Sequence, residues 1–155
     1  IPFPDMRYAD LLLMAAEAWN EAEESPNEKV YGYLNQVRNR AGLEGIKETY
    51  TKYASAQYKD YPSNKSRMRE IIHRERQIEL SCEGSYYWDS RRWKTAEKEL
   101  NRIVQGWNVL NGETAEEYYI PTNLYNQQFT FRDYFAPIPD ADIIRNPQLV
   151  QNPEW

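Results

Sequence analysis

Residues 6–41 read MRYADLLLMAAEAWNEAEESPNEKVYGYLNQVRNRA, and this stretch decides the fold. Side chains that recur at spacings of three and four line one side of its first half: Tyr8, Leu12, Ala15, Trp19 and Ala22. That period is typical of an α-helix with one buried face. The sequence therefore predicts a helix over residues 6–23.

A second helix follows almost at once. Ser25-Pro26-Asn27-Glu28 combines a capping box with a proline at the first helical position, which predicts a helix start. Gly42 predicts the end of that helix. Two helices joined by so short a link run antiparallel, so residues 6–41 are predicted to form an αα-hairpin. Its length is close to the roughly 34 residues of one tetratricopeptide unit.

The pattern predicts less regular structure beyond the hairpin. Gly, Pro, Ser and Asn residues predict a loop over residues 43–65. Two further helices are expected over residues 66–105, the first capped by Ser66 and ended by Gly84, and they form a second hairpin. Prolines punctuate residues 107–155, and their aromatic content predicts a tail that wraps against the helices. The expected class is mostly all-α.

Composition excludes several kinds of site. The chain has 155 residues, a formal net charge of −5, one Cys and one His. The negative charge argues against nucleic-acid binding, since phosphate recognition needs a basic surface. A single Cys allows no internal disulfide, and Cys82 is expected on the apolar face of a helix. Glu70 and His73 match half of a di-iron motif, but the second His is missing. We therefore predict neither a metal site nor a cofactor.

Acidic and basic residues alternate in the second half of the helical region. Glu75, Glu79 and Glu83 follow one another at helical spacing, which is compatible with either a catalytic role or a structural one. A pair of these acids is typical of glycoside hydrolysis, but like charges at this spacing repel unless cations lie nearby. The favoured interpretation is a structural Arg–Glu network between the third and fourth helices. Its arginines are predicted to be Arg74, Arg76, Arg91 and Arg92.

Aromatic residues supply the candidates for ligand contact. They make up 14% of the chain, and four tyrosines fall in the predicted loop. Tyrosine rings in such a loop either pack it onto the body or stack on flat ligands. The candidates for carbohydrate contact are Tyr50, Tyr53, Tyr58, Tyr61 and Trp107.

Several ordered stretches resemble the SusD/RagB family. Residues 7–18 (RYADLLLMAAEA) and 35–43 (NQVRNRAGL) are similar to two of its helical motifs. Residues 75–84 (ERQIELSCEG), followed by YWDSRRW, resemble a third. The closing segments YFAPIP and NPQLVQNPEW resemble the end of the family's sequences. Ser85-Tyr86 and Ser90 depart from the usual pattern, and the tyrosine-rich loop is longer than usual.

The resemblance implies a surface-exposed lipoprotein of the outer membrane. Such proteins bind glycans, or sometimes peptides, and associate with a SusC-like, TonB-dependent transporter. It also implies tetratricopeptide-like helices, and that residues 1–155 form the C-terminal portion of a longer protein. A lipid anchor would lie outside this segment. Two alternatives stay open: an interaction scaffold without a ligand site, and a glycoside hydrolase that uses Glu75 or Glu79.

Overall fold

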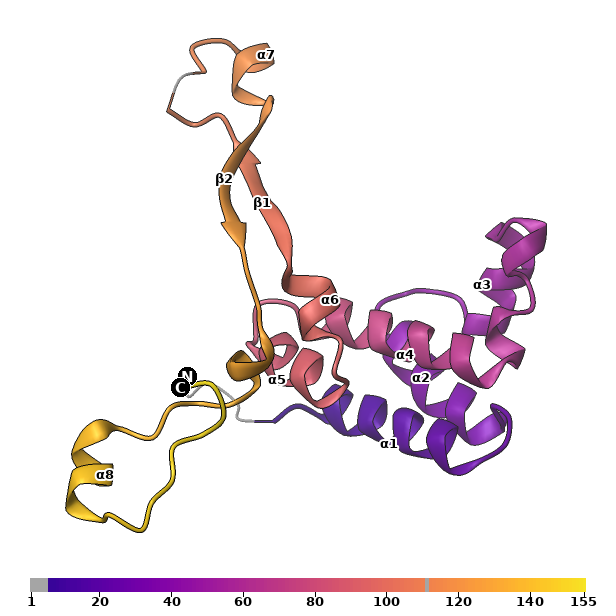
Figure 1. Cartoon of the computed structure of the whole chain (residues 1–155). Coiled ribbons are helices and arrows are strands. Elements are labelled where there is room, and N and C mark those ends of the chain that lie inside the picture. The colour runs from indigo at the N-terminus through magenta and orange to yellow at the C-terminus, as the bar shows by residue number, and fades with distance from the viewer. Residues whose placement is uncertain (1–5, 111) are drawn as a thin grey trace. The chain divides into compact units, whose positions relative to one another are not determined.

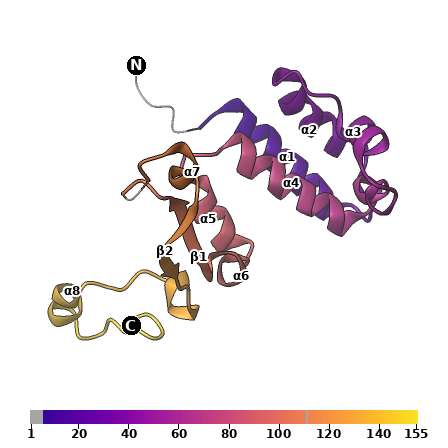
Figure 2. The ribbon, with the colours of Figure 1, turned by 90° about the horizontal axis from the view of Figure 1, so that it is seen from above.

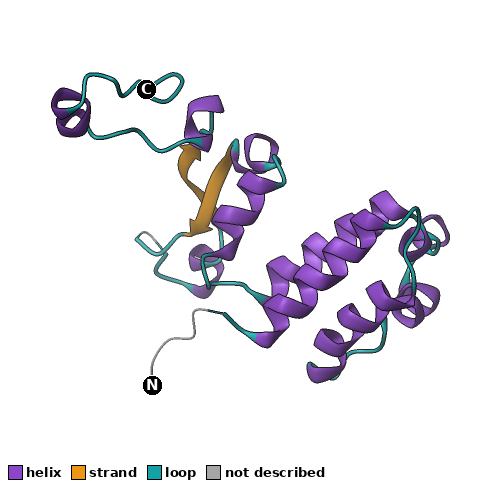
Figure 3. Ribbon diagram, turned by 90° about the horizontal axis from the view of Figure 1, so that it is seen from below, coloured by secondary structure: helices purple, strands orange, loops and turns teal. Residues whose placement is uncertain are grey.

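The computed structural model describes residues 6–110 and 112–155 and divides into two compact units. The first unit ends at Tyr86, and the second comprises Tyr87–Trp155. Most of the regular structure in the described residues is helical, and the sheet found there has two strands (Figure 3). This confirms the predicted, mostly all-α class.

The predicted first hairpin is present. It consists of α1 (Tyr8–Ala22) and α2 (Glu28–Arg40), and α1 packs along both α2 and α4 (Lys65–Glu79), as Figures 1 and 2 show. The N-cap of α2 is Asn27 rather than the predicted Ser25. The Asn27 side chain accepts hydrogen bonds from the backbone N–H groups of Lys29 and Val30, at 3.0 and 3.3 Å. An N-cap side chain satisfies donors that a helix start leaves unpaired, so Asn27 fixes this start.

Gly42 ends α2 as predicted. Its φ is +75°, in the left-handed region that glycine adopts without strain. The N–H groups of Gly42 and Leu43 donate to the carbonyls of Asn39 and Arg38, both at 3.0 Å. This pair of bonds is the Schellman motif, which satisfies the last carbonyls of a helix.

The buried face of α1 differs from the predicted stripe. Ala9, Leu12, Leu13 and Ala16 are buried, whereas Tyr8 is 70% exposed. Because α1 contacts two helices, its buried surface is wider and rotated relative to a stripe that faces one neighbour. The largest apolar side chains that are fully buried in this unit are Leu13, Val30, Leu34, Ile46, Met68 and Ile72.

The predicted loop contains short helices instead. It comprises α3 (Ile46–Tyr53) and two 3-10 turns, η1 (Ala56–Tyr58) and η2 (Tyr61–Ser63). Ile46 is 1% exposed, and its N–H donates to Asn35 Oδ1 at 2.9 Å. One buried apolar anchor and one side-chain cap from α2 are enough to start a helix that the polar composition did not predict.

The third predicted helix, α4, begins and ends earlier than expected. The Asn64 side chain, rather than Ser66, caps it by accepting the Arg67 N–H at 3.1 Å. The helix ends at Glu79, ahead of the predicted Gly84 (φ +79°). Cys82 lies in the turn between them with a φ of +64°, and it is exposed. The prediction that Cys82 occupies the apolar face of a helix is therefore wrong.

The second unit corrects the prediction of one long fourth helix. Helix α5 (Ser85–Arg92) ends before Lys94, whose φ of +57° is incompatible with a right-handed helix. After α6 (Ala96–Leu100) the chain forms strand β1 (Arg102–Trp107), which pairs antiparallel with β2 (Pro121–Gln127). The β-branched Ile103 and Val104 favour the strand. The packing of the helices of residues 66–105 into a second helical hairpin stays a prediction.

The predicted tail contains three more short helical segments. These are α7 (Ala115–Tyr118), η3 (Phe131–Tyr134) and α8 (Asp140–Arg145). The first two each begin with a reciprocal capping box, formed by Thr114 with Glu117 and by Thr130 with Asp133. The wrapping of this tail against the helices of the first unit stays a prediction. Across the described residues, every helix is too short or too polar to cross a lipid bilayer.

Candidate functional site

The four candidate tyrosines of the first unit surround one cavity of about 390 Å³. We call it the tyrosine pocket; it is lined by Thr49, Tyr50, Tyr53, Ala54, Tyr58 and Tyr61. Helix α3 supplies one wall, and the turns η1 and η2 supply the other. The volume lies within the roughly 300–1,000 Å³ of small-ligand sites.

The rings of the tyrosine pocket are ordered by contacts with one another. Tyr50 and Tyr61 stack with centroids 6.4 Å apart and planes 21° apart. Tyr58 meets the Tyr61 ring edge-on at 5.0 Å and 89°. Tyr50 and Tyr61 also pack against the hydrophobic core, whereas Tyr53 is 73% exposed and Tyr58 is 41% exposed. The pocket therefore combines fixed inner rings with accessible outer rings.

The hydroxyl groups of these tyrosines are free to bind a ligand. None of the four forms a hydrogen bond to another residue in the part of the chain that the structure describes. Burial, followed by the nearby charge of Glu75, raises the pKa of Tyr50 above its ordinary value. The Tyr50 hydroxyl is therefore protonated at neutral pH, and it offers one donor and two acceptor positions.

Arg38 fixes the wall of the tyrosine pocket from behind. Only 7% of this residue is exposed, and its three nitrogens bond to three different parts of the unit. Nε donates to the Glu44 carbonyl at 2.9 Å, Nη2 donates to Thr49 Oγ1 at 2.8 Å, and Nη1 forms an ion pair with Glu75. Arg38 therefore connects α2 and α4 to the Thr49 side of the pocket.

A second support lies under η2. Pro62 is buried, and its carbonyl accepts a hydrogen bond from the Tyr31 hydroxyl at 2.8 Å. Tyr31 is part of the hydrophobic core, and the Lys47 ammonium lies 3.8 Å from the centre of its ring. The turn that carries Tyr61 is therefore tied directly to the core.

Charges near the tyrosine pocket are balanced. The Arg67 guanidinium lies 4.9 Å from the Tyr61 ring centre, and it pairs with Glu70 at 2.9 Å. Lys52 lies 5.9 Å from the Tyr53 ring centre and pairs with Glu44. Cations placed this way stabilise the rings, while their paired acids leave little net charge at the rim. Such a site suits a neutral ligand.

The predicted acidic cluster is tied to the first hairpin. Glu79 binds Arg7 at 2.9 Å and Arg40 at 2.7 Å, and Glu83 binds Arg7 at 2.7 Å. Glu75 pairs with Arg38. The predicted network joined these acids to Arg74, Arg76, Arg91 and Arg92, so their partners are corrected here. Residues far apart in sequence supply the cations because α4 packs against α1, and sequence proximity was the wrong guide.

The predicted arginines have other environments. Arg76 is buried and pairs with Asp10 of α1, whereas Arg74 is exposed and forms no ion pair with another described residue. In the second unit, the Arg91 guanidinium lies 3.5 Å from the Tyr87 ring centre. Arg92 pairs with Asp89 at 2.8 Å.

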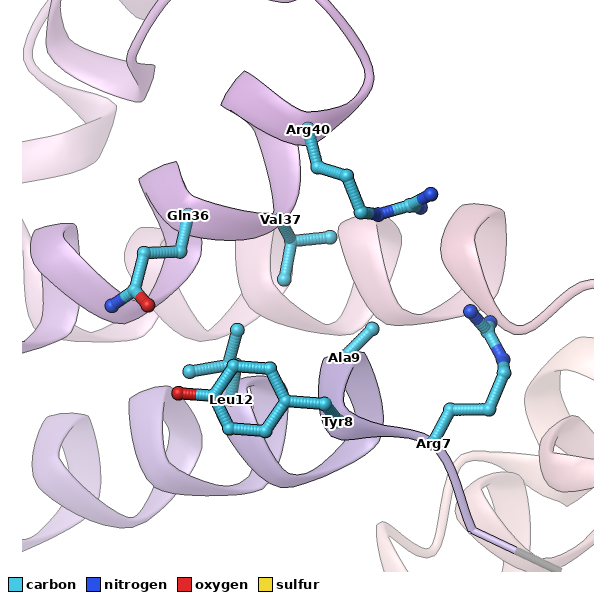
Figure 4. A pocket seen from close by; sticks show the side chains of 7 residues that line it. All are labelled: Arg7, Tyr8, Ala9, Leu12, Gln36, Val37 and Arg40. Carbon is cyan, nitrogen blue, oxygen red and sulfur yellow. The ribbon is translucent and has the colours of Figure 1, made fainter. Parts of the chain in front are cut away.

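Another hollow lies between α1 and α2 (Figure 4). Its volume is about 420 Å³; Ala9, Leu12 and Val37 form its apolar floor. Arg7 and Arg40 lie at one end, where Glu79 already binds both. Gln36 and Tyr8 also line the hollow. Tyr8 is the one aromatic residue among its described lining residues. The hollow therefore offers fewer rings than the tyrosine pocket.

Trp107, the fifth candidate, lies in the other unit. It ends β1 and borders a separate cavity of about 310 Å³ with Gln105, Gly106 and Pro121. The structure thus brings the four tyrosines together and leaves Trp107 in a different setting.

Metal binding finds no support in the described residues. They contain no group of three or more His, Cys, Asp or Glu side chains arranged to hold an ion. His73 lies 3.9 Å from Glu17, and Glu70 pairs with Arg67. These neighbours place the half-motif Glu70–His73 in ordinary polar contacts.

Two supporting residues were missed by sequence reasoning. Arg38 lies four residues after Leu34, a core position of α2, so its helical phase was a sign of burial. Thr49 carried no signal, because its role comes from the approach of Arg38 across eleven residues. Buried arginine is rare unless it is paired, which makes such a position informative.

Comparisons with known proteins agree on one family. The model of the SusD family matches residues 1–155. SusD-like protein P2 from Formosa agariphila is 33% identical over 147 residues, which cover 95% of this chain and 24% of that protein. A SusD-like protein from Bacteroides fragilis is similar in structure, with a TM-score of 0.74, 25% identity, and coverage of 97% of this chain and 25% of that one.

One further solved structure shows the same fold. It is surface glycan-binding protein A from Bacteroides uniformis, with a TM-score of 0.57 and 24% identity over 94% of this chain and 26% of that protein. The chain therefore spans about a quarter of the length of each of these relatives.

Proposed function

The chain belongs to the SusD family, and from this premise we propose that it binds glycans without cleaving them. The chain is a segment of a nutrient-capture protein of the outer membrane. Within that protein, this segment is mainly a scaffold that presents aromatic side chains for ligand contact. A neutral oligosaccharide is the ligand class that the site suits.

The tyrosine pocket carries this proposal. The C–H faces of pyranose rings pack on aromatic faces, while their hydroxyls need nearby donors and acceptors. Tyr53 and Tyr58 offer accessible rings, and the four free hydroxyls supply polar contacts. The core beneath holds the inner rings, so binding orders few side chains and loses little entropy.

The acidic residues support capture rather than hydrolysis. Hydrolysis needs two carboxyl groups on either side of the scissile bond, about 5–9.5 Å apart. Glu75 Oε1 is engaged by Arg38, and the carboxylate of Glu79 is engaged by Arg7 and Arg40. At 15% and 11% exposure, neither side chain is open to solvent. We propose that these ion pairs fix α4 against the first hairpin.

The same proposal extends to the longer protein. Membership of the family supports a partner, a SusC-like, TonB-dependent transporter, and a lipid anchor that lies outside this segment. The segment then contributes to a surface-exposed lipoprotein, and cargo passes from it to the transporter. Purification of the full-length protein from outer membranes tests this, because the transporter is expected to co-purify with it.

Glycan retention tests the function. The 155-residue chain is passed over immobilised neutral polysaccharides built from glucose, xylose, mannose or galactose, and bound ligands are then measured by calorimetry. A double variant, Tyr53→Ala with Tyr58→Ala, is expected to bind roughly tenfold more weakly, because it removes the accessible rings. Both residues are exposed, so folding is expected to be unaffected.

Tyr8→Ala is the matched control. Tyr8 is 70% exposed and borders the hollow between α1 and α2, so its removal tests that hollow instead. Equal affinity of the double variant and the parent chain would exclude the tyrosine pocket. Release of new reducing ends would support the hydrolase, whereas no retention on any polysaccharide would leave the scaffold interpretation.

A further inference from the structure

The two-stranded ribbon of the second unit has two unlike faces. Side chains alternate along a strand, so Ile103, Gln105 and Trp107 share one face of β1. Across the ribbon their partners are Asn126, Asn123 and Pro121. The register shifts by one residue between Val104 and Gln105, where Leu124 of β2 is left unpaired, and this bulge brings Asn126 and Asn123 to the same face. We call this the amide face, because its polar side chains are all uncharged amides. The other face carries Val104 paired with Tyr125.

Trp107 presents an accessible ring on the amide face. It is 51% exposed, and Tyr119 meets it edge-on at 5.5 Å and 84°. The contact is fixed through the ribbon tip, where the Asn108 N–H donates to the Tyr118 carbonyl at 3.0 Å. Helix α7 at the tip is itself capped by Thr114. The Trp107 ring is therefore oriented before any ligand arrives.

Two amides lie next to this ring with unused hydrogen-bonding groups. Gln105 Nε2 donates to Asn123 Oδ1 at 2.9 Å, which fixes the orientation of both side chains. The side-chain oxygen of Gln105 (Oε1) and the side-chain amide hydrogens of Asn123 (on Nδ2) form no hydrogen bond to any described residue. One acceptor and one donor group are thus held beside an exposed indole.

We propose that the amide face is a second sugar-binding site, in which one pyranose ring stacks on Trp107 and its hydroxyls bind Gln105 and Asn123. The site rests on the proposed glycan-binding function and adds a contact outside the first unit. Gln105, Gly106, Trp107 and Pro121 surround a cavity of about 310 Å³ there. An aromatic platform with adjacent neutral donors and acceptors matches the alternating C–H and O–H surface of a sugar.

The chemistry of the face favours a neutral sugar over a charged ligand or a protein strand. Its six paired strand residues carry no ionisable group, so no cation is present there to select a uronic acid or a sulfate. A protein strand would add along the edge of the ribbon, through backbone groups. The Trp107 ring and the amide pair instead project from a face.

Trp107→Ala tests the proposal in the full 155-residue chain. Binding of soluble neutral oligosaccharides is measured by calorimetry, alongside the Tyr53/Tyr58 double variant. Trp107→Ala is expected to weaken binding roughly tenfold, and Gln105→Ala or Asn123→Ala severalfold. Tyr125→Ala is the matched control, because it removes a ring of similar exposure, 59% against 51%, from the opposite face.

The outcomes separate the two proposals. If the parent chain binds and the ribbon variants all match Tyr125→Ala, the second site is wrong while glycan binding stands. If Trp107→Ala alone loses binding and Tyr53/Tyr58 does not, the ribbon is the principal site. The amide variants cover the case in which Trp107→Ala disturbs the ribbon, since they retain the indole. A parent chain that binds no oligosaccharide overturns both proposals.

Discussion

The two units of this chain differ in how much of their apolar surface is buried. In the first unit, α1, α2, α3 and α4 share one hydrophobic cluster, and paired charges such as Arg38–Glu75 lie at its edge. In the second unit, Ala96 and Phe129 are the buried apolar residues among those described. Large apolar side chains there remain exposed instead, including Ile103, Trp107, Leu110, Leu124, Tyr125 and Ile144.

This difference indicates a division of labour. A unit with its own core holds a pocket in place, because its side chains gain from burial without a partner. A two-stranded ribbon is marginal alone, and exposed apolar groups commonly mark surfaces that contact something else. The first unit is thus suited to support, and the second is suited to contact.

Removal of Arg38 is expected to have the largest effect, and it tests whether the first unit is stabilised by its own buried contacts. Arg38→Ala leaves Glu75 without its cation and Thr49 without its donor, so we expect a loss of about 3–5 kcal/mol in the free energy of unfolding. Chemical denaturation followed by circular dichroism measures it. Arg40→Ala is the control, because its side chain is 62% exposed and a loss of at most about 1 kcal/mol is expected. Equal losses would show that the buried pair is unimportant.

Two leucines compare the units directly. Leu13 has no exposed surface, and Leu13→Ala is expected to destabilise the first unit by about 2–5 kcal/mol. Leu124 is 59% exposed on the ribbon, so Leu124→Ala is expected to change stability by only about 0.5 kcal/mol. The midpoint of thermal unfolding checks both. A large effect at Leu124 would mean that the ribbon is buried in the protein as it exists in solution.

Two glycines of the first unit separate backbone conformation from burial. Neither has a neighbour close enough to clash with an added Cβ, but Gly42 has a φ of +75° and Gly32 lies within α2. Gly42→Ala is expected to destabilise by about 1–2 kcal/mol through left-handed strain. Gly32→Ala is expected to stabilise by about 0.5–1 kcal/mol, since alanine favours a helix. Denaturation midpoints that shift in the same direction would contradict this account.

Acid is expected to loosen the ribbon tip, with the smallest effect. Backbone N–H groups of Thr114 and Glu113 lower the pKa of Glu117. A carboxylate whose folded pKa lies below its unfolded value of about 4.3 stabilises the fold above that value, and this stabilisation disappears as the pH falls through the folded pKa. Protection of the amides around α7, measured relative to their intrinsic exchange rate at each pH, should therefore decrease below about pH 4. Glu117→Gln should abolish the dependence, and Glu116→Gln should retain it.

The helical class and the first hairpin were predictable because their signals are local. The apolar period and Gly42 each act within a few residues; the structure confirms the helix and the helix end that they predict, but not the buried stripe. The start of α2 was only approximate, since Ser25 and Asn27 both suit a cap and geometry selects Asn27. The fourth helix failed for a similar reason: Lys94 carries a left-handed conformation that its residue type does not reveal.

The candidate site was only partly accessible from the sequence. The tyrosines were identifiable as a group, but their meeting around one cavity depends on α3, which the polar composition of that segment concealed. The acids of α4 were identifiable as a cluster, but Arg7, Arg38 and Arg40 come from helices that only tertiary packing brings near. Contacts between distant segments leave no mark on a single sequence.

The dual attachment of Arg38 has an evolutionary consequence. Its bonds to Glu75 and Thr49 tie the frame of the tyrosine pocket to the core, so mutations there are constrained by folding. The exposed rings of Tyr53 and Tyr58 carry no such burden. New ligand preferences can therefore arise by exchange of these outer side chains, one at a time, on an inherited frame that does not have to change.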